Sequence, residues 1–114
     1  PSVVFTRAAL TSDRSDVRFT RASPTAELAR AAADGHRRVW LVGGGVLTTA
    51  CRQAGIVTEY IVSVMPVVLG AGIPLFAPGG SFEPLQLVDT RSWPDGVVQL
   101  RYRPHSSPTE GDAA

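Results

Sequence analysis

The most constraining feature of this sequence is a strand-like apolar run that passes through three consecutive glycines into a segment with helical spacing. The apolar run is Arg38–Val42, the glycines are Gly43–Gly45, and the helical segment Val46–Ala54 stops at Gly55. Such a unit leaves unpaired backbone N–H groups at the carboxyl end of the strand, with the positive end of the helix dipole behind them. We therefore predict an α/β domain with an anion pocket, typically for phosphate, at this turn.

A tight turn without a ligand is the alternative interpretation of the same glycines. Glycine lets an anion approach the main chain and tolerates positive φ, and three in a row exceed what a turn needs. However, no third spaced glycine follows Gly45, so the dinucleotide-binding fingerprint is incomplete. From the motif alone, both a phosphate site and a plain turn remain open.

The rest of the chain supplies further strands and one more helix. The strands are predicted from β-branched and aromatic runs, and the helix from an N-cap serine, a proline at its first position and a glycine stop. This helix runs from the cap Ser23 to the stop Gly35. The predicted strands are Pro1–Thr6, Val17–Thr20, Glu59–Leu69, Leu85–Thr90 and Val97–Tyr102. Pro66 marks an end or an edge of the third of these strands. The turn Trp93–Gly96 predicts that the last two strands form an antiparallel hairpin. We identify no internal repeat.

Composition and charge exclude several classes of function. The chain of 114 residues has the size of one soluble domain, and we predict that this domain spans residues 1–104. We predict that residues 105–114 form a disordered tail. All 11 basic residues are arginine, so lysine Schiff-base chemistry and a Walker A phosphate loop are excluded. Positive and negative side chains are scattered along the chain and sum to a net charge of +1, which argues against a nucleic-acid partner. One cysteine and two distant histidines cannot form a structural zinc site. The longest apolar stretches are interrupted by proline and glycine, so we predict no membrane-spanning segment. We expect a reducing, cytoplasmic setting.

Three stretches together resemble the bacterial dihydrofolate-reductase-like superfamily, and most closely its riboflavin-biosynthesis reductase C-terminal domains. They are Val39–Leu47, Ala54–Phe76 and Gly96–Tyr102, and the resemblance extends from Val3 to Tyr102. It implies a mixed, mostly parallel sheet with flanking helices and a C-terminal antiparallel hairpin. It also implies that the complete protein is an oxidoreductase that uses NADPH to reduce a small heterocyclic, pterin-like or ribosylaminopyrimidine-like substrate.

The resemblance assigns roles to residues at two places in the chain and identifies no catalytic residue. It implies that the cofactor pyrophosphate rests on Gly43, Gly44 and Gly45 and on the amides of Val46 and Leu47. It places Thr6 and Arg7, at the end of the first strand, near the adenosine ribose phosphate. It places Val42 along the nicotinamide and substrate cleft.

Two departures from the family pattern are informative. Thr58-Glu59 stands where the family has Asp-Glu, and the family's N-terminal strands and substrate-binding helix have no counterpart. Their loss would leave buried backbone groups unpaired, at roughly 1 to 3 kcal/mol each. We therefore expect a C-terminal part of a longer protein, or a second chain that supplies the missing strands, with a homodimer as one form. The alternative function is a non-catalytic binding or assembly module that retains the fold.

Other candidate residues have simpler interpretations. We predict that Cys51 is structural, that Glu59 pairs with an arginine, and that Asp89 faces solvent. We predict that His36 lies in a solvated turn and that His105 belongs to the tail. The predicted core residues are Trp40, Tyr60, Met65, Phe76 and Tyr102, and the residues predicted to alternate outward without a ligand are Arg101 and Arg103.

Overall fold

A computed structural model describes residues 1–105, which form two compact units. The first unit holds Pro1–Gly55 together with Leu75–Ala77, and the second holds Ile56–Pro74 and the chain from Pro78 onward. Most of the predicted tail, residues 106–114, lies outside the described residues. Each unit has its own sheet, so each is described by itself.

A parallel pair of short strands opens the first unit. Strand β1 spans Ser2–Phe5 and β2 spans Val17–Thr20, as the β-branched and aromatic runs predict. The register pairs Ser2 with Val17 and Phe5 with Thr20. Because the strands are parallel, their carboxyl ends lie at the same edge of the sheet.

Helix α1, Pro24–Ala33, follows β2 and has the predicted boundaries. The Ser23 side chain accepts a hydrogen bond from the Ala26 N–H at 3.2 Å, and Pro24 occupies the first turn, where its missing N–H costs nothing. After the helix, Gly35 has a φ of +88°, the left-handed conformation that glycine adopts most readily. These local signals explain why this helix is predictable from the sequence.

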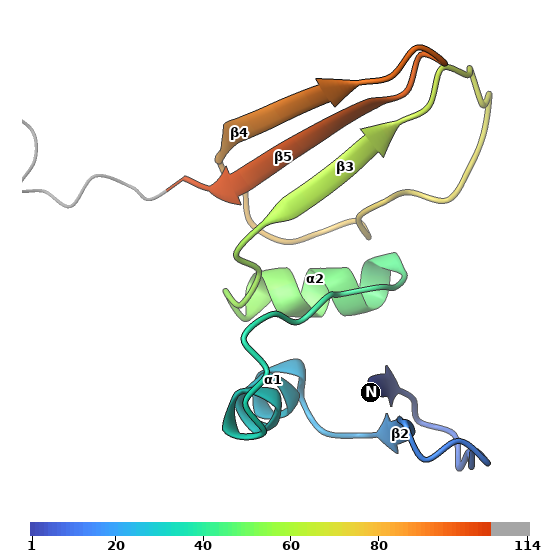
Figure 1. Cartoon of the computed structure of the whole chain (residues 1–114), viewed down its shortest axis with the longest axis vertical. Helices are drawn as coiled ribbons and strands as arrows, with labels where there is room; N and C mark the ends of the chain where they lie inside the picture. Colours follow the sequence, from blue (N-terminus) through green and yellow to red (C-terminus); the bar gives the residue numbers. More distant parts are fainter. Residues whose placement is uncertain (106–114) are drawn as a thin grey trace, which may run out of the picture. The chain divides into compact units, whose positions relative to one another are not determined.

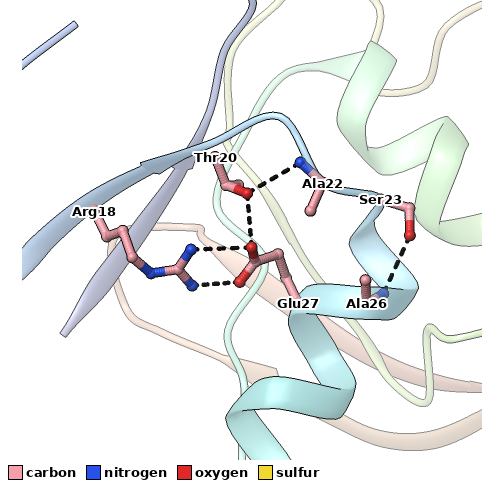
Figure 2. Close-up of polar contacts among 6 residues, drawn as sticks. All are labelled: Arg18, Thr20, Ala22, Ser23, Ala26 and Glu27. Atoms are coloured by element: carbon pink, nitrogen blue, oxygen red, sulfur yellow. Dashed lines mark hydrogen bonds and ion pairs between the residues drawn. The ribbon is translucent and has the colours of Figure 1, made fainter.

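A buried carboxylate joins α1 to β2. The side chain of Glu27 is only 9% exposed. It accepts two hydrogen bonds from the Arg18 guanidinium and a third from the Thr20 hydroxyl (Figure 2), and the last of these measures 2.6 Å. The contact with Arg18, and then that with Thr20, holds the pKa of Glu27 at about 2, against an ordinary value of 4.5. The ionised carboxylate thus fixes the first turn of α1 to the end of β2.

We expect this carboxylate to make the stability of the first unit dependent on pH. Because folding lowers its pKa, Glu27 contributes its full stabilisation above pH 4.5 and loses it as the pH falls towards 2. Thermal unfolding of the wild type should therefore lose more stability between pH 4.5 and pH 2 than that of Glu27→Gln, which has no proton to gain. Parallel pH profiles of the two proteins would contradict this role of Glu27.

The predicted strand at Arg38–Val42 does not form, and this prediction is wrong. The structure has no strand between α1 and the next helix, and the Trp40 side chain is 88% exposed and that of Val42 76% exposed. The apolar pattern is strand-like, but a strand also requires a neighbour to bond its N–H and C=O groups. Among residues 1–105, β1 and β2 pair only with each other, so this segment has no such neighbour.

Helix α2, Gly45–Gln53, follows the three glycines and confirms the second predicted helix. It is followed by Gly55, which has a φ of +67°. Cys51 is buried on this helix, and burial raises the pKa of its thiol. A buried, protonated thiol is a poor nucleophile, in agreement with the structural role predicted for Cys51.

The second unit is a three-stranded antiparallel sheet. Strand β3 spans Tyr60–Val64, β4 spans Leu85–Ser92 and β5 spans Val98–Pro104, with β5 between the other two (Figure 1). Strands β4 and β5 form the predicted hairpin, which the Trp93 N–H closes by donating to the Val97 carbonyl at 3.0 Å. The α/β class and the hairpin are confirmed. One mostly parallel sheet is not found, because the described strands form two sheets with a single parallel pair.

The predicted packing of the second unit is only partly confirmed. Tyr60 is buried and its hydroxyl donates to Glu83 at 2.8 Å, whereas Met65 is 52% exposed. The predicted core residues Phe76, in the first unit, and Tyr102 are half-buried, and His36 and His105 are exposed. Trp40 and Met65 are therefore wrong as core residues, because each lies outside the paired strands and helices.

Ion pairs in the second unit centre on β5. Glu59 pairs with the Nε atoms of Arg101 at 3.2 Å and Arg103 at 3.6 Å, which confirms its arginine partner. Both arginines therefore have a carboxylate partner, which the prediction of outward-pointing side chains did not include. Asp89 is half-buried and pairs with Arg91 at 3.4 Å, so its predicted solvent-facing position is only partly correct. In the described part of the chain, no helix is long and apolar enough to span a bilayer.

Candidate functional site

Two similar turns lie side by side where β1 and β2 end. The Thr6 N–H donates to the Thr20 carbonyl at 3.0 Å, which places the two threonines at one edge of the parallel pair. Each threonine hydroxyl oxygen accepts the N–H two residues ahead, from Ala8 in the first turn and Ala22 in the second, both at 3.1 Å. The two chain reversals thus use the same local hydrogen bond.

The sequence contains the reason for this likeness. Residues 3–8 read Val-Val-Phe-Thr-Arg-Ala and residues 17–22 read Val-Arg-Phe-Thr-Arg-Ala, so they differ only where Val4 is matched by Arg18. The statement that the chain has no internal repeat is therefore wrong for this short segment. The repeat places a second Thr-Arg pair, Thr20-Arg21, beside the pair Thr6-Arg7 that the family resemblance selects.

A hollow of about 300 Å³ opens at these turns, and we call it the strand-end hollow. Its lining residues come from both turns and from the end of β2: Thr6, Ala8, Ala9, Leu10, Phe19, Thr20 and Arg21. The charged side chain in this lining is that of Arg21, which sequence analysis did not select. Of the pair that the resemblance places near the adenosine ribose phosphate, Thr6 lines the hollow and Arg7 does not. The repeated Thr-Arg-Ala is the signal that could have identified Arg21.

The glycine turn begins α2 with an open backbone. Gly44 is the N-cap residue, and no side chain caps the helix. A Cβ placed on Gly44 would meet no described protein atom within 4 Å, apart from its neighbours in the chain. No hydrogen bond found for residues 1–105 satisfies the amides of Gly45, Val46 and Leu47. An oxyanion at Gly44 would therefore find unpaired donors and the positive end of the helix dipole.

Gly45 needs to be glycine for a different reason. A Cβ at this position would lie 2.8 Å from the Ala77 backbone nitrogen, so the chain at Leu75–Ala77 approaches too closely for any side chain. None of Gly43–Gly45 has a positive φ, so a left-handed backbone is not the reason for glycine at this turn. One glycine thus serves packing within the first unit, while Gly44 leaves space for a ligand.

The side chains around the glycine turn are apolar. Val42 and Val46 are exposed on either side of the glycines, at 76% and 82%, and Leu47 is half-buried. No hydrogen bond or ion pair among the described residues joins this turn to Thr6 or Arg7. The structure therefore gives two separate features of the first unit, the strand-end hollow and the N-terminus of α2.

The charges in the first unit favour anions over cations as ligands. The carboxylate of Glu27 accepts a hydrogen bond from Thr20, which lines the hollow. Its negative charge is compensated by the ion pair with Arg18. Across residues 1–105, no group of three histidine, cysteine, aspartate or glutamate side chains could hold a metal ion.

Comparisons with known proteins agree with this architecture. The chain is 44% identical over 64 residues to the uncharacterized protein YyaP of Bacillus subtilis (strain 168), and this match covers 56% of the chain and 34% of YyaP. It is 34% identical over 86 residues to the uncharacterized protein YwjB of the same organism, covering 75% of the chain and 49% of YwjB. The matched part thus spans at most about half the length of these relatives.

Solved structures share the fold at low sequence identity. A protein from Shewanella sp. PV-4, described as a candidate riboflavin biosynthesis protein, has a TM-score of 0.81 at 19% identity, over 93% of this chain and 61% of that one. A pyrimidine reductase-like protein from Corynebacterium diphtheriae has a TM-score of 0.66 at 21% identity, over 80% and 39%. RibD from Acinetobacter baumannii has a TM-score of 0.61 at 23% identity, over 78% and 27%.

A family model gives the more specific result, since identities this low establish the fold alone. The model of the RibD C-terminal domain matches residues 1–99. This range includes both repeated turns, the strand-end hollow and the glycine turn. The chain therefore belongs to the RibD C-terminal domain family.

Proposed function

We propose that this chain carries the cofactor-binding part of an NADPH-dependent reductase. The observation that carries the proposal is the N-terminus of α2, where Gly44 is uncapped by any side chain and has free space in front of it. A diphosphate is a ligand that such an open set of amides binds well, because each N–H can donate to a phosphate oxygen without a Cβ in the way.

Each residue of the turn has a defined part in this proposal. The backbone of Gly43, Gly44 and Gly45 forms the contact surface for the diphosphate, and the amides of Val46 and Leu47 donate to it. Val42 is the residue before the glycines, and its exposed side chain is available to line the nicotinamide and substrate cleft. When bound, NADPH supplies the hydride, and the protein supplies the orientation of the cofactor.

The substrate we propose is a small heterocycle of the pterin or ribosylaminopyrimidine class. Family membership and the pyrimidine reductase-like neighbour support reductase chemistry in riboflavin biosynthesis. Thr6 belongs to the strand-end hollow and is available to the adenosine end of the same cofactor. Val42 is the residue of this chain that we assign to the substrate cleft, and we assign no proton donor to it.

Binding of NADPH to the chain tests the proposal through Trp40. This side chain is 88% exposed and lies three residues before Gly43, so bound nicotinamide should accept its excitation energy. In Trp93→Phe, which leaves Trp40 as the reporter, NADPH should quench tryptophan emission and gain emission of its own. Trp40→Phe is the control, and it measures the part of the signal that comes from Trp93. A folded, monodisperse protein that shows no binding would remove the proposed cofactor.

An assembly role is a second candidate function, favoured by the exposed segment Arg38–Val42. Its apolar side chains and its lack of a strand partner suit pairing with a further strand. We propose that a preceding segment of a longer protein or a second copy of the chain supplies that strand. If the chain is a binding module only, it should assemble in light scattering while failing the NADPH titration, whereas a reductase part should bind NADPH.

A further inference from the structure

A short segment of the first unit, Leu75–Ala77, contacts α2 near both of its ends, and we call it the clasp. A Cβ on Gly45 would lie 2.8 Å from the Ala77 backbone nitrogen, so the clasp touches the first turn of the helix. The guanidinium carbon of Arg52, in the last turn, lies 5.3 Å from the centre of the Phe76 ring. Gly45 and Arg52 are seven residues apart, about two helical turns, and therefore share one face of α2.

The exposure of the surrounding chain shows where the clasp is anchored. Every residue from 63 to 82 is exposed except Phe76 and Ala77, which are half-buried. Apolar character alone does not explain this difference, because Ile73 is 96% exposed and Phe82 is 93% exposed. A guanidinium attracts the face of an aromatic ring, and more strongly where both groups are partly withdrawn from water. The contact with Arg52 distinguishes Phe76 from Phe82 and anchors the clasp.

The first turn of α2 depends on such an anchor, because it is open to fraying. Gly44 offers no side-chain hydrogen bond to cap the helix, and uncapped helix ends open readily. The Thr48 N–H closes the first turn by donating to the Gly44 carbonyl at 3.2 Å, the long end of the usual range. The Ala77 backbone lies against Gly45 in this same turn. A clasp that stays in place therefore restricts the opening of the turn.

We infer that Arg52 is a positioning residue for the proposed diphosphate site. Through the Phe76 ring it holds the clasp against Gly45, and the clasp keeps the amides of the first turn in one arrangement. Donors that are already arranged bind a ligand more tightly, because less conformational freedom is lost on binding. The inference rests on the proposed NADPH function, and it adds to that site a residue about two helical turns beyond the glycines.

Substitutions on both sides of the contact test this role in the full chain. We expect Arg52→Gln and Phe76→Leu each to weaken NADPH binding by about threefold to tenfold, the range for loss of a half-buried cation–π contact. The double variant should bind about as well as either single variant, because both changes remove the same contact. Arg52→Lys retains a cation for the ring and should bind NADPH better than Arg52→Gln does.

The chain offers a matched control for each substitution. Arg30→Gln removes the arginine in the last turn of α1, and Phe82→Leu removes a ring that is already exposed. Neither control should change the affinity for NADPH by more than about twofold. If Arg52 acted on the diphosphate directly through its charge, Arg52→Gln would weaken binding and Phe76→Leu would not. That result would overturn the inference.

Amide hydrogen exchange without any ligand separates failure of this inference from failure of the proposed function. Exchange of the Thr48 N–H requires the first turn of α2 to open, so it should be about threefold to tenfold faster in Arg52→Gln and in Phe76→Leu. The Glu27 N–H closes the first turn of α1 by donating to the Ser23 carbonyl at 3.1 Å, and its exchange should not change. If Thr48 responds in this way and the wild type does not bind NADPH, the positioning of α2 by Arg52 stands and the proposed cofactor fails. Unchanged exchange at Thr48 in both variants would contradict the positioning role.

Discussion

Gly44→Asp should abolish tight binding of NADPH while leaving the chain folded. The new carboxylate would lie where the diphosphate is proposed to rest, in space that is free of the described protein atoms. A repulsion of about 2 kcal/mol at this partly solvated site corresponds to roughly a thirtyfold loss of affinity. The fluorescence titration that detects NADPH through Trp40 measures this loss directly.

The fold should tolerate this change because Gly44 is the N-cap of α2. Aspartate is a favourable N-cap residue, and its charge interacts well with the helix dipole, so the helix should gain up to about 1 kcal/mol. Gly44→Asn is the matched control, since asparagine caps equally well and has almost the same shape without the charge. We expect Gly44→Asn to bind NADPH much better than Gly44→Asp. Equal affinity in the two variants would show that no phosphate rests at this turn.

Gly45→Ala should destabilise the protein, although alanine is the better helix former. Helix propensity alone would favour alanine by about 1 kcal/mol. The added Cβ, however, would lie 2.8 Å from the Ala77 backbone nitrogen, so one of the two segments must move. Overpacking of this kind costs on the order of 1 to 3 kcal/mol, and each kcal/mol lowers the melting temperature by about 4 °C in a domain of this size.

The neighbouring position provides the control for this effect. Gly44→Ala adds the same methyl group one residue earlier, where nothing lies within 4 Å. Its melting temperature should stay within a few degrees of the wild type, because the only change is at an uncapped N-cap position. Thermal unfolding followed by circular dichroism compares the two variants. A Gly45→Ala protein as stable as Gly44→Ala would contradict the close approach of Ala77.

The elements that sequence analysis predicts correctly are those fixed by local signals. Helix α1 has its cap at Ser23, its proline at the first position and its glycine stop, and the β4–β5 hairpin has its turn residues, so both are found. The predicted strand Arg38–Val42 has the right side chains, but a strand depends on a partner that no local pattern contains. The core position that the pattern predicts for Trp40 is wrong for the same reason, and its side chain is exposed.

The candidate site also combines residues that local sequence signals identify with residues that only the fold brings together. The glycine turn and Thr6 are recognisable from the sequence, and the structure adds that Gly44 and Gly45 have different reasons to be glycine. Arg21 was missed because its position depends on the pairing of β2 with β1, which brings two distant copies of Thr-Arg-Ala to one edge. A search for repeats as short as six residues would have suggested it.

The segment Leu75–Ala77 has a consequence for dissecting this protein. It belongs to the first unit, although the residues on both sides of it in the sequence belong to the second. Within the first unit, the Arg52 guanidinium lies over the Phe76 ring at 5.3 Å, and the Ala77 backbone lies against Gly45. No single truncation can therefore yield both units intact, and a fragment ending at Gly55 would lack the residues that cover the first turn of α2. The segments of the two units thus alternate along the sequence.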